Sequence, residues 1–189
     1  MNHFHSAKII AFVGLPGSGK STAVNFFTEK GFPKVYFGGV ILQAMKDANL
    51  EINPENEKKF REEFRLKNGK EAVAREVIKQ IQNLMAAGQH RIIADGLYSW
   101  TEYKELKHTF PGELTVVAIL APKQLRYQRL AHRPERPMTE HQVTERDWKE
   151  IENLEKGGPI AIADYFILND KDEAALKKSL TDLANELQF

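Results

Sequence analysis

The sequence predicts an α/β fold built on a parallel sheet, and three observations lead to that prediction. Stretches with the apolar character of strands alternate with stretches of helical periodicity along the chain. Two of the strand-like stretches, residues 8–13 and 114–120, are almost continuously apolar, as are parallel strands that are buried on both faces. A glycine-rich turn at residues 14–21 joins the first of these strands directly to a helix-like stretch.

The first half of the chain is expected to contain three strands and four helices. Gly31, Gly69 and Gly88 suit positions at which helices end, and Pro54 suits a first helical turn. Gly38 and Gly39 are expected to close the second strand. In chain order we expect a strand at 8–13, a helix at 19–31, a strand at 34–37, helices at 40–49, 54–68 and 72–87, and a strand at 91–95.

The second half is expected to add two strands and four helices. Pro122 suits the first turn of a helix, and Thr139 with Gln142 has the pattern of a capping box. The Gly-Gly-Pro sequence at 157–159 is expected to end the helix that the capping box begins. In chain order we expect a helix at 99–108, a strand at 114–120, helices at 122–133 and 140–155, a strand at 165–168 and a helix at 172–187.

Residues 14–21 carry the strongest functional signal. They match the phosphate-binding pattern G-x-x-x-x-G-K-[ST] at every fixed position, between a strand and a helix as the pattern requires, so a chance match is disfavoured. The glycines let successive N–H groups point at one anion, and the helix N-terminus adds partial positive charge. Lys20 is expected to reach the outer phosphates and Ser21 to bind Mg²⁺. The expected nucleotide-binding residues here are Gly14, Pro16, Gly17, Ser18, Gly19, Lys20, Ser21 and Thr22.

Asp95 ends a buried strand and is followed by Gly96, which predicts a carboxylate beside the phosphate loop. There it would hold Mg²⁺, directly or through water. An aspartate that only caps a helix or forms a turn is the alternative. The phosphate loop favours the metal-side role.

Arginines at helical spacing form the third signal. Arg126, Arg129 and Arg133 are at i, i+3 and i+7, on one face of a helix, with Arg136 and Arg146 further on. Arginines stabilise the charge that phosphoryl transfer builds on phosphate oxygens, so we predict Arg129 and Arg133 to be catalytic and Arg126 to bind nucleotide. A solvated helix face paired with glutamates is the alternative.

Two weaker groups face the expected acceptor side. One is a basic cluster, which could equally be an exposed charged helix, and the other is a set of aromatic residues at strand ends, which could equally be packing. The basic cluster is Arg61, Arg65 and Arg75, and the aromatic set is Tyr36, Phe37, Tyr98 and Trp100.

Bulk properties limit the function classes. The chain has 189 residues, 42% hydrophobic and 28% charged, with a formal net charge of +1, and acids are interleaved with its basic runs, so a nucleic-acid partner is not expected. It has no cysteine, no apolar run of membrane-spanning length and no signal-peptide pattern in its first six residues, which makes the cytoplasm the expected location. Monomer and homodimer both remain open.

Taken together, the phosphate loop, the Asp95-Gly96 strand end and the arginines from 126 to 146 resemble the nucleoside monophosphate kinase group of P-loop proteins. A closer likeness, along nearly the whole chain, is to small kinases described as related to dephospho-CoA kinase or adenylate kinase. It rests on Gly-Lys-Glu-Ala-Val-Ala at 69–74, Ala-Pro at 121–122, Glu-Arg-Asp at 145–147 and Ile-Ala-Asp-Tyr at 162–165.

The resemblance implies one P-loop NTPase domain over residues 1–189, a three-layer fold with a five-stranded parallel sheet of order 2-3-1-4-5. It also implies an acceptor-side insertion at 38–75, a lid-like region at 126–157, ATP with Mg²⁺ as cofactors, and an adenine contact at Gly158. The chain departs from those kinases at Gly39 and Leu42, where a base and an arginine are usual, and at Tyr98, near the place of the acceptor-binding arginine.

The resulting functional prediction is an ATP-dependent phosphotransferase for a small nucleotide or nucleotide-like acceptor. Phosphoryl transfer to a phosphate acceptor needs no base, whereas with an alcohol acceptor Asp95 is the best available base. The alternative is a nucleotide-dependent switch or weak ATPase that acts through a protein partner, which the three departures favour.

Overall fold

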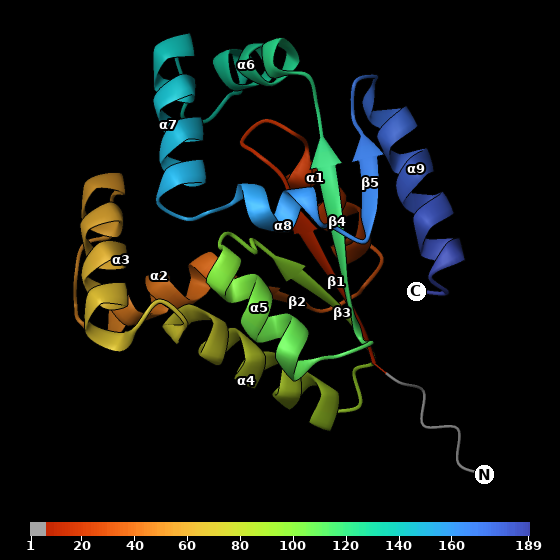
Figure 1. Cartoon of the computed structure of the whole chain (residues 1–189), viewed down its shortest axis with the longest axis horizontal. Helices are drawn as coiled ribbons and strands as arrows, with labels where there is room; N and C mark the ends of the chain where they lie inside the picture. The colour runs from red at the N-terminus through yellow and green to blue at the C-terminus, as the bar shows by residue number, and fades with distance from the viewer. Residues whose placement is uncertain (1–6) are drawn as a thin grey trace.

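The computed structural model describes residues 7–189, so the six residues in which no signal-peptide pattern was found lie outside it. Within the described residues, five strands form one parallel sheet in the order β2-β3-β1-β4-β5 (Figure 1). This confirms the predicted fold class and strand order. The strands are β1 (Lys8–Val13), β2 (Lys34–Tyr36), β3 (Arg91–Asp95), β4 (Leu114–Leu120) and β5 (Tyr165–Leu168).

Helices lie on both faces of this sheet and beyond the carboxyl ends of its strands. Figure 1 shows α2, α4 and α5 on one side of the strands and α9 on the other. The helices are α1 (Lys20–Thr28), α2 (Phe37–Asp47), α3 (Pro54–Asn68), α4 (Ala72–Ala86), α5 (Trp100–Thr109), α6 (Lys123–His132), α7 (Glu140–Glu152), α8 (Gly157–Ala161) and α9 (Glu173–Glu186).

The two faces of β1 show why its sequence is continuously apolar. Ile9, Ala11 and Val13 pack into a core shared with α2, α4 and α5, while Ile10 and Phe12 pack into a second core shared with α1 and α9. Successive side chains of a strand point to opposite faces, so a strand covered on both sides needs an apolar residue at every position.

Helix ends differ from the sequence prediction by up to three residues, and α1, for example, ends at Thr28 rather than at residue 31. Two of the differences have a clear local reason. Helix α2 begins at Phe37 rather than at residue 40, so Gly38 and Gly39 lie in its first turn. Their lack of a side chain has a local reason, because a Cβ on Gly38 would come within 2.4 Å of the Tyr36 hydroxyl oxygen. We expected these glycines to end β2, but they make room for a tyrosine that folds back over the helix.

The second difference is α8, a five-residue helix where an irregular stop was expected. Helix α7 ends at Glu152, earlier than predicted, and the chain turns at Glu155, whose φ is +53°. Pro159 lies in the first turn of α8, where its missing N–H costs no helical hydrogen bond. This turn lets α8 return toward the sheet and positions Lys156.

Helices α6 and α7 lie beyond the carboxyl end of β4 in Figure 1. They share a small apolar cluster of Tyr127, Leu130 and Val143. The capping box predicted at the start of α7 is present, with Thr139 and Gln142 each accepting a hydrogen bond from the other's backbone N–H. None of the helices within residues 7–189 combines the length and apolar character that a membrane span requires.

Candidate functional site

The phosphate loop is built on three glycines with positive φ. Gly14, Gly17 and Gly19 have φ of +147°, +77° and +105°, in the region that side chains other than glycine rarely adopt. Neighbouring atoms also leave no room for a side chain. A Cβ on Gly14 would come within 2.4 Å of the Ile119 carbonyl oxygen, and a Cβ on Gly17 would come within 2.8 Å of the Arg126 carbonyl oxygen. The loop is therefore packed from outside into one curled shape.

Two polar side chains of this loop, Ser18 and Lys20, lie in different places. The Ser18 hydroxyl has no hydrogen-bond partner among the described residues and lies on the packed side of the loop, where a Cβ on Gly14 would come within 2.7 Å of it and within 2.4 Å of the Ile119 carbonyl oxygen. The Lys20 ammonium lies over the loop, where it donates to the Leu15 carbonyl oxygen at 3.3 Å. Residues 14–21 thus fit the phosphates of a nucleotide.

Lys20 is in an unusual electrostatic environment. Burial, followed by the positive charge of Lys156, lowers the pKa of Lys20 from 10.5 to about 7. Arg146 acts in the same direction, whereas the carboxylates Glu150 and Asp95 act against it. An anion bound at the loop would restore the charged form of this lysine.

Asp95 lies at the carboxyl edge of the sheet, as expected. In the strand register it is opposite Phe12 of β1 and Tyr36 of β2, so it is next to the strand that leads into the phosphate loop. Burial raises the pKa of Asp95, partly offset by Lys34, whose ammonium is 3.7 Å from the carboxylate. A carboxylate here and the Ser21 hydroxyl in the first turn of α1 are both oxygen donors, which is the ligand type that Mg²⁺ prefers.

Arg126 and Arg129 both lie on α6, but Arg133, predicted on the same helical face, follows the end of α6 with an extended backbone. Arg126 is 5% exposed and forms a two-pronged ion pair with Asp147, at 3.1 and 2.6 Å. Its guanidinium also donates to the Pro16 carbonyl oxygen at 2.9 Å. This geometry favours a role for Arg126 in holding α7 and the phosphate loop together over direct contact with nucleotide.

Arg129 and Arg133 donate to main-chain oxygens rather than to carboxylates. Arg129 donates to the main-chain oxygens of Asn169 and Lys171, at 3.0 and 3.3 Å. Arg133 is half-buried and donates to the Arg136 carbonyl oxygen; burial, then the nearby charges of Arg146 and Arg136, lower its pKa. Within the described part of the chain, no carboxylate forms an ion pair with Arg129 or Arg133.

The arginines of the predicted acceptor-side cluster, Arg61, Arg65 and Arg75, are all paired with carboxylates. The Arg65 partner, Glu102, is fully buried and also accepts from the backbone N–H groups of Tyr98 and Ser99. These contacts fix α3 to the turn after β3, which favours the structural alternative. The pairs are Arg61 with Glu57, Arg65 with Glu102 and Arg75 with Glu71.

The aromatic residues divide between core and rim. Phe37 is 1% exposed and belongs to the core, which supports packing. Trp100 stacks on Tyr103 and lines a hollow of about 420 Å³ with Ile151 and Gly158. Gly158, predicted to contact adenine, lies so close to the Trp100 ring that a Cβ would come within 2.7 Å of it.

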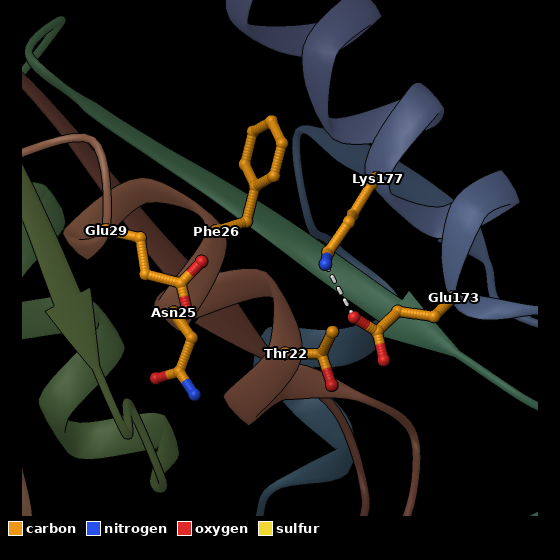
Figure 2. A pocket seen from close by; sticks show the side chains of 6 residues that line it. All are labelled: Thr22, Asn25, Phe26, Glu29, Glu173 and Lys177. Atoms are coloured by element: carbon orange, nitrogen blue, oxygen red, sulfur yellow. Dashed lines mark ion pairs between the residues drawn. The ribbon is translucent and has the colours of Figure 1, made fainter.

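A second hollow, of about 150 Å³, lies between α1 and the start of α9. Figure 2 shows Thr22 of α1 facing Glu173 of α9, whose carboxylate is bound to Lys177 at 2.6 Å. Thr22, which was predicted to bind nucleotide, lines this hollow between the two helices.

Sequence reasoning missed two contributors to the site. Asn169, just after β5, is 6% exposed and donates from its side-chain amide to the Ser18 carbonyl oxygen at 2.8 Å. Lys156, just before α8, is 1% exposed and binds Glu150 of α7. Asn169 had a signal in its position after the last strand, whereas Lys156 is within a charged run in which nothing marks one lysine as buried.

Known proteins resemble this chain in both sequence and fold. A family model described as an AAA domain matches residues 10–156. The UPF0200 protein TK1334 of Thermococcus kodakarensis is 33% identical over 186 residues, covering 95% of this chain and 100% of that protein.

Among solved structures, TT1252 from Thermus thermophilus has a TM-score of 0.69 at 17% identity, covering 96% of this chain and 98% of that one. A shikimate kinase from Bacteroides thetaiotaomicron has a TM-score of 0.59 at 13% identity, covering 96% and 99%. Likeness at this identity shows the fold, which is that of P-loop kinases. The predicted resemblance to P-loop kinases is confirmed at that level.

Proposed function

We propose that this chain, which belongs to the UPF0200 family and whose residues 10–156 belong to the AAA domain family, is an ATP-dependent kinase for a small acceptor. The observation that carries the proposal is the phosphate loop. Its glycines have the positive φ angles that let successive N–H groups converge on one anion, and the Lys20 ammonium lies over the loop.

Within this proposal each side chain has a distinct task. Lys20 binds the outer phosphates, and Ser21 with Asp95 would hold Mg²⁺, which supplies charge neutralisation to the phosphates when bound. Arg129 and Arg133 would turn from main-chain oxygens to the transferring group, since neither is neutralised by a carboxylate among the described residues. Residues 126–157 then act as a lid that excludes water, and residues 38–75 border the acceptor.

The acceptor is proposed to be a nucleotide or a nucleotide-like molecule, in line with the resemblance to dephospho-CoA kinases and nucleoside monophosphate kinases. A phosphate acceptor is favoured slightly over an alcohol, because it attacks as an anion and needs no base. In the structure Asp95 is already bound to Lys34, which also suits a metal-side or electrostatic role better than proton transfer.

A coupled assay for ADP release tests the kinase proposal. ATP and Mg²⁺ would be offered with AMP, other nucleoside monophosphates, dephospho-CoA and shikimate, one at a time. We expect at least one acceptor to raise ADP release at least about tenfold above the rate with water, as specific positioning of an acceptor requires. ATP turnover that no acceptor changes would contradict the kinase proposal and favour the switch or weak ATPase.

Replacing Arg129 or Arg133 with alanine is expected to lower kcat at least about tenfold and leave thermal unfolding unchanged. Neither side chain is part of a buried ion pair in the described structure, so its loss should affect charge stabilisation rather than folding. Arg75→Ala, which removes an exposed arginine paired with Glu71, is the matched control. A variant with a lower Tm but normal kcat would place that arginine in structure instead.

A further inference from the structure

Lys156 combines a charge with nearly complete burial. Its side chain is 1% exposed, its ammonium binds Glu150, and its backbone N–H donates to the Glu150 carbonyl oxygen at 3.2 Å. Glu150 is shared, because Arg146 donates to its other carboxylate oxygen at 3.0 Å. Lysine is among the residue types least often buried, since removing an ammonium from water is costly.

The location of this ammonium is more informative than its burial. It lies 4.9 Å from the centroid of the Tyr98 ring. Tyr98 follows the end of β3, the strand whose last residue, Asp95, is at the carboxyl edge beside β1. Lys156 is therefore over the edge of the sheet at which the phosphate loop begins. In the sequence it lies near the C-terminal end of the lid-like region, residues 126–157.

A purely structural lysine would be poorly placed here. Its charge repels Lys20, since Lys156 is the nearby charge that lowers the pKa of Lys20 most. Around Lys20, the cations Lys156 and Arg146 face the carboxylates Glu150 and Asp95, so with Lys20 itself the cations are in excess. A buried ion pair is also weak evidence for stability, because desolvation offsets most of the attraction. An anion bound at the phosphate loop would offset this repulsion.

We propose that Lys156 is a catalytic residue that binds the phosphoryl group in transit, with Glu150 holding its ammonium in place between turnovers. The inference rests on the proposed kinase function and names a phosphate-binding residue that the arginine pattern did not include. In the transfer, the bond from the γ-phosphorus to the β–γ bridging oxygen breaks with its electron pair going to ADP, and an acceptor oxygen forms the new bond to phosphorus. Lys156 donates hydrogen bonds to the non-bridging oxygens and transfers no proton.

The test compares two variants that differ only at Lys156. Glu150→Gln removes the shared carboxylate, and Glu150→Gln combined with Lys156→Met removes both charges, so that the double variant has no unpaired buried carboxylate. Calorimetry on the full chain with Mg²⁺ would measure the Kd of ADP alone and of ADP with aluminium fluoride, which imitates the phosphoryl group in transit. Thermal unfolding of every variant is followed in parallel.

The double variant is expected to bind ADP within about twofold of Glu150→Gln but ADP with aluminium fluoride at least about tenfold more weakly. Lys149→Met, which removes an exposed lysine of α7 next to Glu150, should change neither constant. Equal binding of the analogue by the two variants, or an equal loss for ADP and the analogue, would overturn the role of Lys156. If the unmodified chain does not bind ADP at all, the proposed function fails and the inference fails with it.

Discussion

Lys20→Ala is expected to abolish phosphoryl transfer and to weaken ATP binding at least about tenfold. The Lys20 ammonium lies over the phosphate loop, 3.3 Å from the Leu15 carbonyl oxygen, where the outer phosphates of a nucleotide would replace that oxygen as its partner. Removing one well-placed donor to developing charge typically costs two to three powers of ten in kcat, which is about 3–4 kcal/mol. Radiolabelled transfer from ATP and calorimetric ATP binding would measure the two effects.

The same substitution should not lower the free energy of unfolding, and the direction of this effect follows from the pKa of Lys20. A lysine whose pKa is lowered in the folded state opposes folding while it is charged, fully below about pH 7 and less and less as the pH rises toward 10.5. Its removal at neutral pH should leave Tm unchanged or raise it. Lys30→Ala, in the exposed turn after the same helix, is the control. Full transfer activity in Lys20→Ala would contradict the proposed function.

The fold and the donor half of the site were predictable from the sequence because they depend on local patterns. The continuous apolar residues of β1 specify a strand buried on both faces, and residues 14–21 specify a loop whose glycines must have positive φ. Asp95 followed from the same reasoning, since the carboxyl ends of neighbouring parallel strands meet at one edge. In each case the signal lies within a few residues of the side chain concerned.

The rest of the site depends on contacts between distant segments, which local patterns do not contain. Helical spacing correctly indicates that Arg126 and Arg129 share a face, but not that one meets Asp147 and the other the carbonyl oxygens after β5. Likewise, two glycines and a proline argue against a helix at 157–161, yet packing of α8 against α5 outweighs that weak preference. The burial of Lys156 follows from this misassigned helix, so it could not have been predicted.

Arg126→Met is expected to destabilise the protein by about 3–5 kcal/mol, the largest stability effect that we predict. The Arg126 and Asp147 side chains are 6% and 9% exposed, and both carboxylate oxygens of Asp147 accept from the Arg126 guanidinium. Removing the arginine leaves a buried carboxylate without its partner, and it also leaves the Pro16 carbonyl oxygen without this donor. Urea unfolding at neutral pH would measure the loss, with Arg75→Met expected to cost no more than about 1 kcal/mol because its ion pair with Glu71 is exposed.

A double variant, Arg126→Met with Asp147→Leu, separates the structural role of Arg126 from the predicted contact with nucleotide. Replacing both charges by apolar side chains should recover most of the lost stability, because the stability of a buried ion pair and that of a well-packed apolar pair are often similar. If Arg126 acts only by joining α6, α7 and the phosphate loop, the recovered protein should bind ATP nearly as well as the unmodified chain. If Arg126 contacts nucleotide, ATP binding should stay weak although the fold is restored. The position of its guanidinium, between Asp147 and the Pro16 carbonyl oxygen, favours the first result.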